Sequence, residues 1–137
     1  MNKLTLRNMF YKESKNQRQL GFEKETLVIN YLEKLGYRIL ARNWYNSNRG
    51  ELDIIAIDPE RFNEEYLVFI EVKYRKDSID YSLNALSKTK QSKLKKLALY
   101  YCKKENLNPL NVNISFDFIA LNDEQIEHIK NIFSYSH

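Results

Sequence analysis

The sequence contains little cysteine and little histidine, and each shortage excludes a class of site. Cys102 is the only cysteine among 137 residues, so the chain can form neither an internal disulfide nor a metal site built from several thiolates. The two histidines, His128 and His137, lie far in sequence from the acidic residues discussed below and have no ligand-like spacing. We therefore expect no functional role for either histidine. The single cysteine fits a reducing cytosol.

Long apolar runs are also missing. No stretch approaches the ~20 consecutive apolar residues that span a bilayer, and the N-terminus lacks the apolar core of a signal peptide. We therefore expect a cytoplasmic protein with no membrane partner. Glycine and proline are scarce as well, with three and two residues, and 43% of the chain is hydrophobic. Length and composition together predict one ordinary globular domain with a real core.

The charge is mildly basic. The formal net charge is +4 at pH 7, and the pI is near 9.0. This excess favours polyanionic partners but is equally common among ordinary soluble proteins. Residues 1–18 contain five basic residues and one acid, without a sustained apolar period. We expect them to form a flexible tail, with a basic arm for nucleic acid as the alternative, and residues 19–137 to form the domain.

Residues 20–35 have the apolar spacing of a helix that ends at Gly36. On a helical wheel one continuous arc is apolar, and its members are Leu27, Val28, Ile29, Tyr31, Leu32 and Leu35. Glu25 falls inside this arc, whereas the other acids of the helix lie outside it. A glutamate that faces the core is costly without a partner. Glu25 is therefore either a boundary residue bonded to backbone or to Lys73, or an active-site acid, and we favour the second interpretation.

Two apolar runs rich in β-branched residues, 52–57 and 67–72, are predicted strands. The polar segment between them, residues 58–65, contains Pro59 and is expected to be a loop. Gly50 precedes the first strand, where it allows a tight turn.

Charged residues interrupt both strands. Glu51 and Asp53 share one face at the start of the first strand, and Glu71 and Lys73 share a face at the end of the second. Antiparallel pairing would bring Asp53, Glu71 and Lys73 together at one end of the sheet. Neighbouring carboxylates repel each other, and a divalent cation removes that repulsion. Because hard oxygen ligands suit Mg²⁺ or Mn²⁺, the pattern predicts a metal site.

This arrangement resembles a known motif. Asp followed by Glu-x-Lys at the end of the next strand is similar to the PD-(D/E)XK nuclease superfamily. The fuller sequences at residues 50–56 (GELDIIA) and 69–75 (FIEVKYR) resemble the YraN-like family of bacterial proteins. Members of that family are predicted endonucleases related to Holliday-junction resolvases. The resemblance spans roughly residues 19–133 and implies a restriction-endonuclease-like fold.

The resemblance also covers the first helix. The family pattern Gly-x-x-Gly-Glu-x-x-Ala places the first acidic residue of the family at Glu25, which the helical wheel singles out independently. The chain departs from the family pattern at Lys24, Val28, Tyr45, Ser82 and Ser115. The departures at Lys24, Tyr45 and Ser82 keep a second class of function open, namely a non-catalytic nucleic-acid-binding module of nuclease ancestry.

The resemblance implies metal-dependent hydrolysis of nucleic-acid phosphodiesters. Asp53 and Glu71 would hold Mg²⁺ or Mn²⁺, with the Val72 carbonyl as a further ligand. Lys73 would orient the attacking water and stabilise negative charge on the phosphorus centre. Glu25 would hold a second metal ion or one of its waters.

Glu51 is a secondary candidate for the site. It shares the face of Asp53, but it could also serve only as an ion-pair partner of Arg49. Nucleic acid is the expected partner, DNA in preference to RNA, with branched or linear substrates and a homodimer left open.

Residues 88–104 are predicted to form an amphipathic helix, because Leu94, Leu97, Ala98 and Tyr101 follow the i, i+3, i+4, i+7 spacing. This segment contains seven lysines and no acid. A solvated helix face and a phosphate-binding surface are equally favoured interpretations. The basic residues expected to contact nucleic acid are Arg49, Arg75, Lys90, Lys93 and Lys96, and Lys90 matches a lysine that recurs in the family.

The remaining segments complete an α/β domain. Residues 37–45 and 112–121 are predicted strands, and residues 123–133 fit either a helix or a hairpin strand. Asp117 alternates with large apolar residues, so we expect a structural role, with a bond to a neighbouring strand. The order helix, three strands, helix, strand predicts a mixed sheet packed by two helices. The restriction-endonuclease-like core has this same order.

Overall fold

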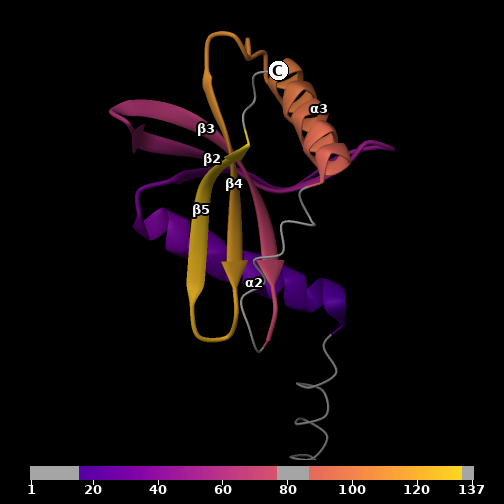
Figure 1. Cartoon of the computed structure of the whole chain (residues 1–137), viewed down its shortest axis with the longest axis vertical. Helices are drawn as coiled ribbons and strands as arrows, with labels where there is room; N and C mark the ends of the chain where they lie inside the picture. Colours follow the sequence, from indigo (N-terminus) through magenta and orange to yellow (C-terminus); the bar gives the residue numbers. More distant parts are fainter. Residues whose placement is uncertain (1–15, 77–86, 134–137) are drawn as a thin grey trace, which may run out of the picture.

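A computed structural model describes residues 16–76 and 87–133 of the chain. Its elements are α2 (Gln17–Lys34), β1 (Arg38–Asn46), β2 (Gly50–Arg61), β3 (Glu64–Tyr74), α3 (Lys88–Lys104), β4 (Asn113–Leu121) and β5 (Ile126–Phe133). The five strands form one sheet in the order β1-β2-β3-β4-β5. Figure 1 labels β2 to β5 of this sheet, together with both helices. Strands β3 and β4 are parallel and the other neighbours are antiparallel. This is the predicted mixed sheet with two helices, extended by β5, and it is consistent with a restriction-endonuclease-like core.

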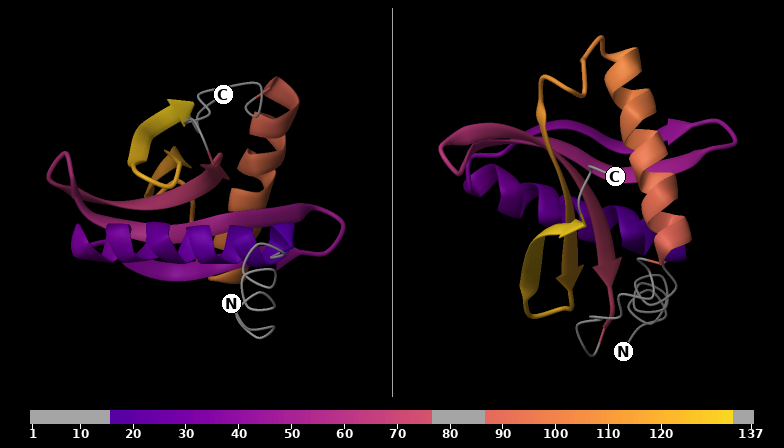
Figure 2. Two further views of the ribbon diagram at one scale, coloured as in Figure 1. Left: turned by 90° about the horizontal axis from the view of Figure 1, so that it is seen from below. Right: turned by 45° about the horizontal axis from the view of Figure 1, so that its top comes forward.

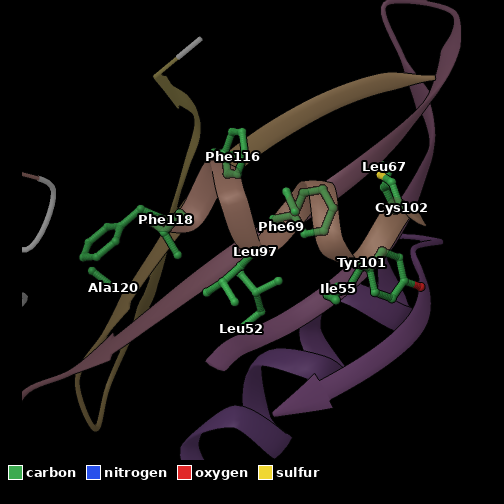
Figure 3. Close-up of a cluster of buried hydrophobic side chains, with 12 residues drawn as sticks. Leu52, Ile55, Leu67, Phe69, Leu97, Tyr101, Cys102, Phe116, Phe118 and Ala120 are labelled. Atoms are coloured by element: carbon green, nitrogen blue, oxygen red, sulfur yellow. The ribbon is translucent and has the colours of Figure 1, made fainter. Parts of the chain in front are cut away.

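The two helices cover opposite faces of the sheet. Because strand side chains alternate, the central strands bury apolar side chains on both faces. The cluster under α2 contains Val28, Leu32, Tyr37, Ile54, Ala56, Val68, Ile70, Ile119 and Leu121. The cluster under α3 contains Leu52, Ile55, Leu67, Phe69, Leu94, Leu97, Ala98, Tyr101, Cys102, Phe116, Phe118 and Ala120, most of them labelled in Figure 3. These two clusters fix both helices relative to the sheet.

Both helices have side-chain caps at their N-termini. Asn16 accepts from the Gln19 N–H at 2.8 Å, and Ser87 accepts from the Lys90 N–H at 3.2 Å. At the other end of α2, Gly36 has φ +91° and closes the helix as predicted. Neither described helix is long and apolar enough to cross a membrane.

Helix α2 differs from the prediction in two respects. It begins at Gln17, two residues inside the range that was expected to be a tail. Residues 1–15 of that tail lie outside the described residues, and so does Ser82. In addition, Leu27 and Leu35 are 48% and 55% exposed, so the buried stripe is narrower than the wheel indicated. The cause is geometric, since one helix lying on a sheet buries only the side chains directly beneath it.

The predicted loop at residues 58–65 is wrong. Strand β2 continues to Arg61, and only Phe62 and Asn63 form the turn to β3. Both residues have positive φ, +53° and +64°, which suits the twist of a two-residue hairpin. Proline has no N–H to donate to a neighbouring strand. Pro59 is tolerated in β2 because the pairing of β2 with β1 ends at Ile57, two residues earlier.

The ambiguous segment at residues 123–133 is a strand. Strand β5 pairs antiparallel with β4. The side chain of Asn122 accepts the N–H groups of Glu124 and Gln125, both at 2.8 Å, and so builds the turn between the strands.

Candidate functional site

The sheet forks at the end where the predicted catalytic residues lie. Residues 50–52 of β2 pair only with β1, and residues 71–74 of β3 pair only with β4. In Figure 2 the β1–β2 hairpin and the end of β3 accordingly run in different directions. The Val72 N–H donates to the Asp53 carboxylate at 2.9 Å, so a side chain replaces the missing ladder bond. Asp53 thus lies where the two arms separate.

Asp53 lies within the electrostatic influence of three other carboxylates at this fork. Burial and, after it, the negative charge of Glu71 raise the pKa of Asp53 to about 7, although the bond from the Val72 N–H opposes the increase. Glu25 and Glu51 also raise this pKa. The acids come from three elements: α2 contributes Glu25, β2 contributes Glu51 and Asp53, and β3 contributes Glu71. The negative charges of the other three acids that the sequence singles out therefore all act on Asp53.

Glu25 faces the sheet, as the helical wheel predicts. Its side chain is only 12% exposed and lies 3.6 Å from the Arg42 guanidinium. Asn43 donates to its carboxylate at 3.0 Å. Burial raises the pKa of Glu25, although both neighbours oppose the increase. Its partners are thus Asn43 and Arg42, rather than the Lys73 or backbone group considered from the sequence.

Asn43 is a site residue that the sequence analysis missed. It lies in β1 with φ +49°, a left-handed conformation that asparagine tolerates better than most residues. This backbone conformation turns its amide toward Glu25. An asparagine inside an otherwise regular strand was the available signal, because asparagine is depleted in strands.

Glu71 forms an ion pair with a lysine of α3, the helix that covers the face of the sheet opposite α2. The Lys90 amine lies 3.0 Å from the Glu71 carboxylate. Lys90 belongs to the first turn of α3, where a positive charge is unfavourable next to the helix dipole. Its contact with Glu71 offsets that repulsion, and it places Lys90 at the acidic site instead of on the outer face of the helix.

Lys73 lies on β3 two residues after Glu71, opposite Ala120 of β4, and is half-buried. No ion pair joins its amine to another residue within 16–76 or 87–133. Its expected position beside Asp53 and Glu71 therefore stays a prediction.

A groove of about 770 Å³ separates the β1–β2 turn from α3. Its lining residues are Asn48, Arg49, Lys88, Thr89, Ser92, Lys93, Lys96, Leu97 and Tyr100. The Arg49 guanidinium lies over the Tyr100 ring at 4.0 Å, which fixes one wall. Gly50 allows the turn to approach α3, because a Cβ there would lie 2.8 Å from the Lys93 Cε.

Three of the five predicted nucleic-acid-binding residues line this groove, namely Arg49, Lys93 and Lys96. Lys90 contacts Glu71 instead. Arg75 lies just beyond the end of β3, where its guanidinium donates to the Tyr74 carbonyl at 3.1 Å.

The profile of the family described as "Uncharacterised protein family UPF0102" matches residues 24–121. The chain belongs to the UPF0102 family. A UPF0102 protein of Thermodesulfovibrio yellowstonii is 45% identical over 116 residues, covering 84% of this chain and 96% of that protein. A UPF0102 protein of Lachnoclostridium phytofermentans is 39% identical over 119 residues, covering 86% of this chain and 95% of that protein. This result confirms the YraN-like resemblance, and the matched range includes all four acids of the fork.

The acids of this UPF0102 protein are held by protein groups in the structure. Among the described residues, no three His, Cys, Asp or Glu side chains are arranged to hold a metal ion. Asp53 is bonded to the Val72 N–H, Glu71 to Lys90 and Glu25 to Asn43. The donor set nevertheless fits a hard divalent cation, because it consists of carboxylate oxygens whose charges repel one another.

Proposed function

We propose that this UPF0102 protein is a metal-dependent nuclease that hydrolyses nucleic-acid phosphodiesters. The observation that supports this proposal best is the electrostatic repulsion of Asp53 by Glu71 and Glu25 at the fork, next to a lysine-lined groove. Carboxylates that repel one another are unfavourable for the fold unless a cation neutralises them. A groove lined by lysines and an arginine attracts a polyanion.

The proposed roles are those that the resemblance to the PD-(D/E)XK nucleases implies. Asp53 and Glu71 would hold Mg²⁺ or Mn²⁺, with the Val72 carbonyl as a further ligand. When bound, this ion supplies Lewis-acid chemistry, in that it polarises the phosphate and lowers the pKa of a water. The Lys73 amine orients the attacking water and donates to a phosphate oxygen as negative charge builds up. Glu25, oriented by Asn43, holds a second ion or a water at the α2 side.

The basic groove positions the substrate. Lys93, Lys96 and Arg49 contact backbone phosphates, which fixes the register of the chain but carries no sequence information. The rival function is a nucleic-acid-binding module without activity. It uses the same groove but needs neither Lys73 nor a metal.

The decisive experiment compares cleavage with binding. Labelled linear, flapped, single-stranded and four-way-junction substrates are incubated with Mg²⁺ or Mn²⁺. Asp53→Asn keeps the side-chain size but removes a metal-binding charge, so it should abolish cleavage while sparing or improving substrate binding. Lys73→Ala should reduce cleavage by about 10²- to 10³-fold and leave metal binding largely intact, because lysine is not a ligand.

Glu33→Gln is the matched control, since Glu33 is an exposed acid of the same protein whose change to an amide should leave cleavage unaltered. If the wild type binds one of these substrates tightly and cleaves none, the result supports the binding-module function and contradicts the nuclease function. Cleavage by Asp53→Asn at the wild-type rate would show that the activity comes from another site or a contaminant.

A further inference from the structure

A second groove lies on the α2 side of the β1–β2 hairpin and reaches the same acidic fork. Its volume is about 730 Å³. The residues that line it are Gln17, Arg18, Gly21, Phe22, Glu25, Asn43, Tyr45 and Glu51. Because Glu25 and Glu51 are both acids of the fork, this groove is continuous with the candidate active site. The hairpin therefore separates two grooves, one against each helix.

Two aromatic rings are left in water along this groove. Tyr45 is 66% exposed and Phe22 is 52% exposed. The Phe22 ring is held in place, since the Arg42 guanidinium lies 3.7 Å from its centre. Arg42 itself is anchored by donating to the Phe22 carbonyl at 2.8 Å and to the Thr26 hydroxyl at 3.0 Å. The groove thus presents two exposed aromatic rings beside the acids, of which the Phe22 ring is fixed by Arg42.

The charges of the two grooves differ in a way that distinguishes their occupants. The α3 groove is lined by lysines and an arginine and has no acid in its lining. The α2 groove contains Glu25 and Glu51 against one arginine, Arg18. Carboxylates repel a phosphate but accept hydrogen bonds from the amino groups of nucleobases. Aromatic rings, in turn, stack on bases.

We propose that the α2 groove binds the base of an unpaired nucleotide next to the cleaved phosphodiester. The base stacks on Tyr45, and its edge meets the carboxylate of Glu51 and the amides of Gln17 and Asn43. The nucleotide must be unpaired, because the faces of a base inside a duplex are already stacked on its neighbours. This proposal deepens the proposed nuclease function, on which it rests for the position of the cleaved bond. The recognition chemistry is shared by DNA and RNA.

The test is a binding measurement that does not depend on cleavage. Fluorescence anisotropy in EDTA gives the affinity of the wild type for a blunt duplex, a single strand and a duplex with a single-stranded overhang. We expect the two substrates with unpaired nucleotides to bind more tightly than the blunt duplex. Tyr45→Ala should weaken their binding by about 5- to 100-fold, the range for loss of one stacked base. Binding of the blunt duplex should be unchanged.

Phe62→Ala is the matched control, because Phe62 is an aromatic residue with 81% exposure just beyond the opposite end of β2. It should change no affinity. Tyr45→Phe keeps the ring and should restore binding to the wild-type level. As a second readout, 2-aminopurine at the unpaired position should change its fluorescence on binding to the wild type and not on binding to Tyr45→Ala. Circular dichroism checks that each variant is folded.

Equal effects of Tyr45→Ala and Phe62→Ala on all three substrates would overturn the inference. It would also be overturned if the wild type bound the blunt duplex as tightly as the duplex with an overhang, or if it bound none of the three substrates. If the wild type cleaves with Mg²⁺ and Tyr45→Ala does not weaken binding, the nuclease function is supported and the base-binding role of this groove is rejected. Conversely, binding of single strands that depends on Tyr45, without cleavage of any substrate, supports this groove and rejects the nuclease function.

Discussion

At the scale of single residues, the ionisation of Asp53 opposes folding. Its ordinary pKa is 3.8, and burial together with Glu71 raises the folded-state pKa to about 7. The folded protein thus binds this proton more tightly than the unfolded chain, so the resulting stabilisation is complete below about pH 4 and is lost as the pH rises through 7. Asp53→Asn should therefore raise the free energy of unfolding at pH 8 by roughly 1–3 kcal/mol and change it little at pH 4. Urea denaturation at both pH values measures this difference.

Magnesium provides an internal check on the same variant. A ligand that binds only the folded state stabilises it, so Mg²⁺ should raise the melting temperature of the wild type and not that of Asp53→Asn. Glu33→Gln should behave like the wild type. A variant that is less stable than the wild type at pH 8 would show that the bond from the Val72 N–H outweighs the repulsion.

The Glu71–Lys90 pair leads to a prediction about metal affinity. The Lys90 amine lies 3.0 Å from the Glu71 carboxylate, where it competes with a divalent cation. Lys90→Met should therefore bind Mn²⁺ more tightly than the wild type, by up to about fivefold, because a partly exposed ion pair contributes about 1 kcal/mol at most. Isothermal titration calorimetry measures the affinity.

Lys96→Met removes the same charge from the same helix, and Lys96 forms no ion pair with an acid among the described residues. This variant therefore controls for the general electrostatic effect of the helix. Equal affinities for the two variants would mean that Lys90 does not hold Glu71 in solution.

The sequence predicted the acids better than their partners. Glu25 stands out because it interrupts an apolar arc, and this pattern depends only on helix geometry. Asn43 and Arg42 reach Glu25 from β1, some 18 and 17 residues further along the chain. Such pairings depend on how α2 crosses the sheet, which no local spacing encodes.

At the scale of elements, α3 has two groups of lysines with different surroundings. Lys93 and Lys96 line the groove, whereas Lys103 and Lys104 are exposed in the last turn, outside it. Replacing Lys93 and Lys96 together by alanine should reduce the slope of log affinity against log salt by about 2, if each contacts one phosphate. Nucleic-acid binding at several salt concentrations provides the slopes.

The double variant of Lys103 and Lys104 carries the same loss of charge and should leave the slope nearly unchanged. If both double variants lower it equally, the helix attracts nucleic acid only through its overall charge, and the groove does not define the binding site.

The elements themselves followed from periodicity, apart from two features of the sheet. Residues 88–104 form the predicted helix, and its apolar stripe is buried as expected. The turn at Phe62 was missed because phenylalanine is not a usual residue where φ is positive. The fork was missed because strand patterns predict which face a side chain occupies, not where two paired strands separate.

At the scale of the whole molecule, the sheet is held together by a buried polar network on its α2 face. Arg61, at the end of β2, uses all five of its N–H donors on Asp58, Tyr37, Ser115 and Asp117. Asp117 of β4 also accepts from the Asn131 N–H of β5 and lies 2.7 Å from the His128 ring. The predicted structural role of Asp117, with a bond to a neighbouring strand, is therefore confirmed. This network joins the end of the β2–β3 hairpin to β4 and β5.

Asp117→Asn tests how much this network stabilises the fold. Burial alone would raise the pKa of Asp117, but its bonds with His128, Arg61 and the Asn131 N–H lower it well below the ordinary value. The ionised carboxylate therefore stabilises the folded state above the unfolded-state pKa of 3.8, and this contribution is lost as the pH falls through the acidic range. At pH 7 the variant should lose about 2–4 kcal/mol, because it leaves the buried Arg61 guanidinium with Asp58 as its only anionic partner.

Urea denaturation between pH 7 and pH 3 should show that loss shrinking below about pH 4, because the unfolded wild-type chain then binds a proton at Asp117 that the folded protein does not. Glu124→Gln, an exposed acid in the β4–β5 turn, should have little effect at any pH. If Asp117→Asn and Glu124→Gln are equally stable at pH 7, Asp58 alone compensates Arg61. Strands β4 and β5 would then be fixed to the β2–β3 hairpin by the β3–β4 backbone pairing and by apolar contacts, without a contribution from the Asp117 charge.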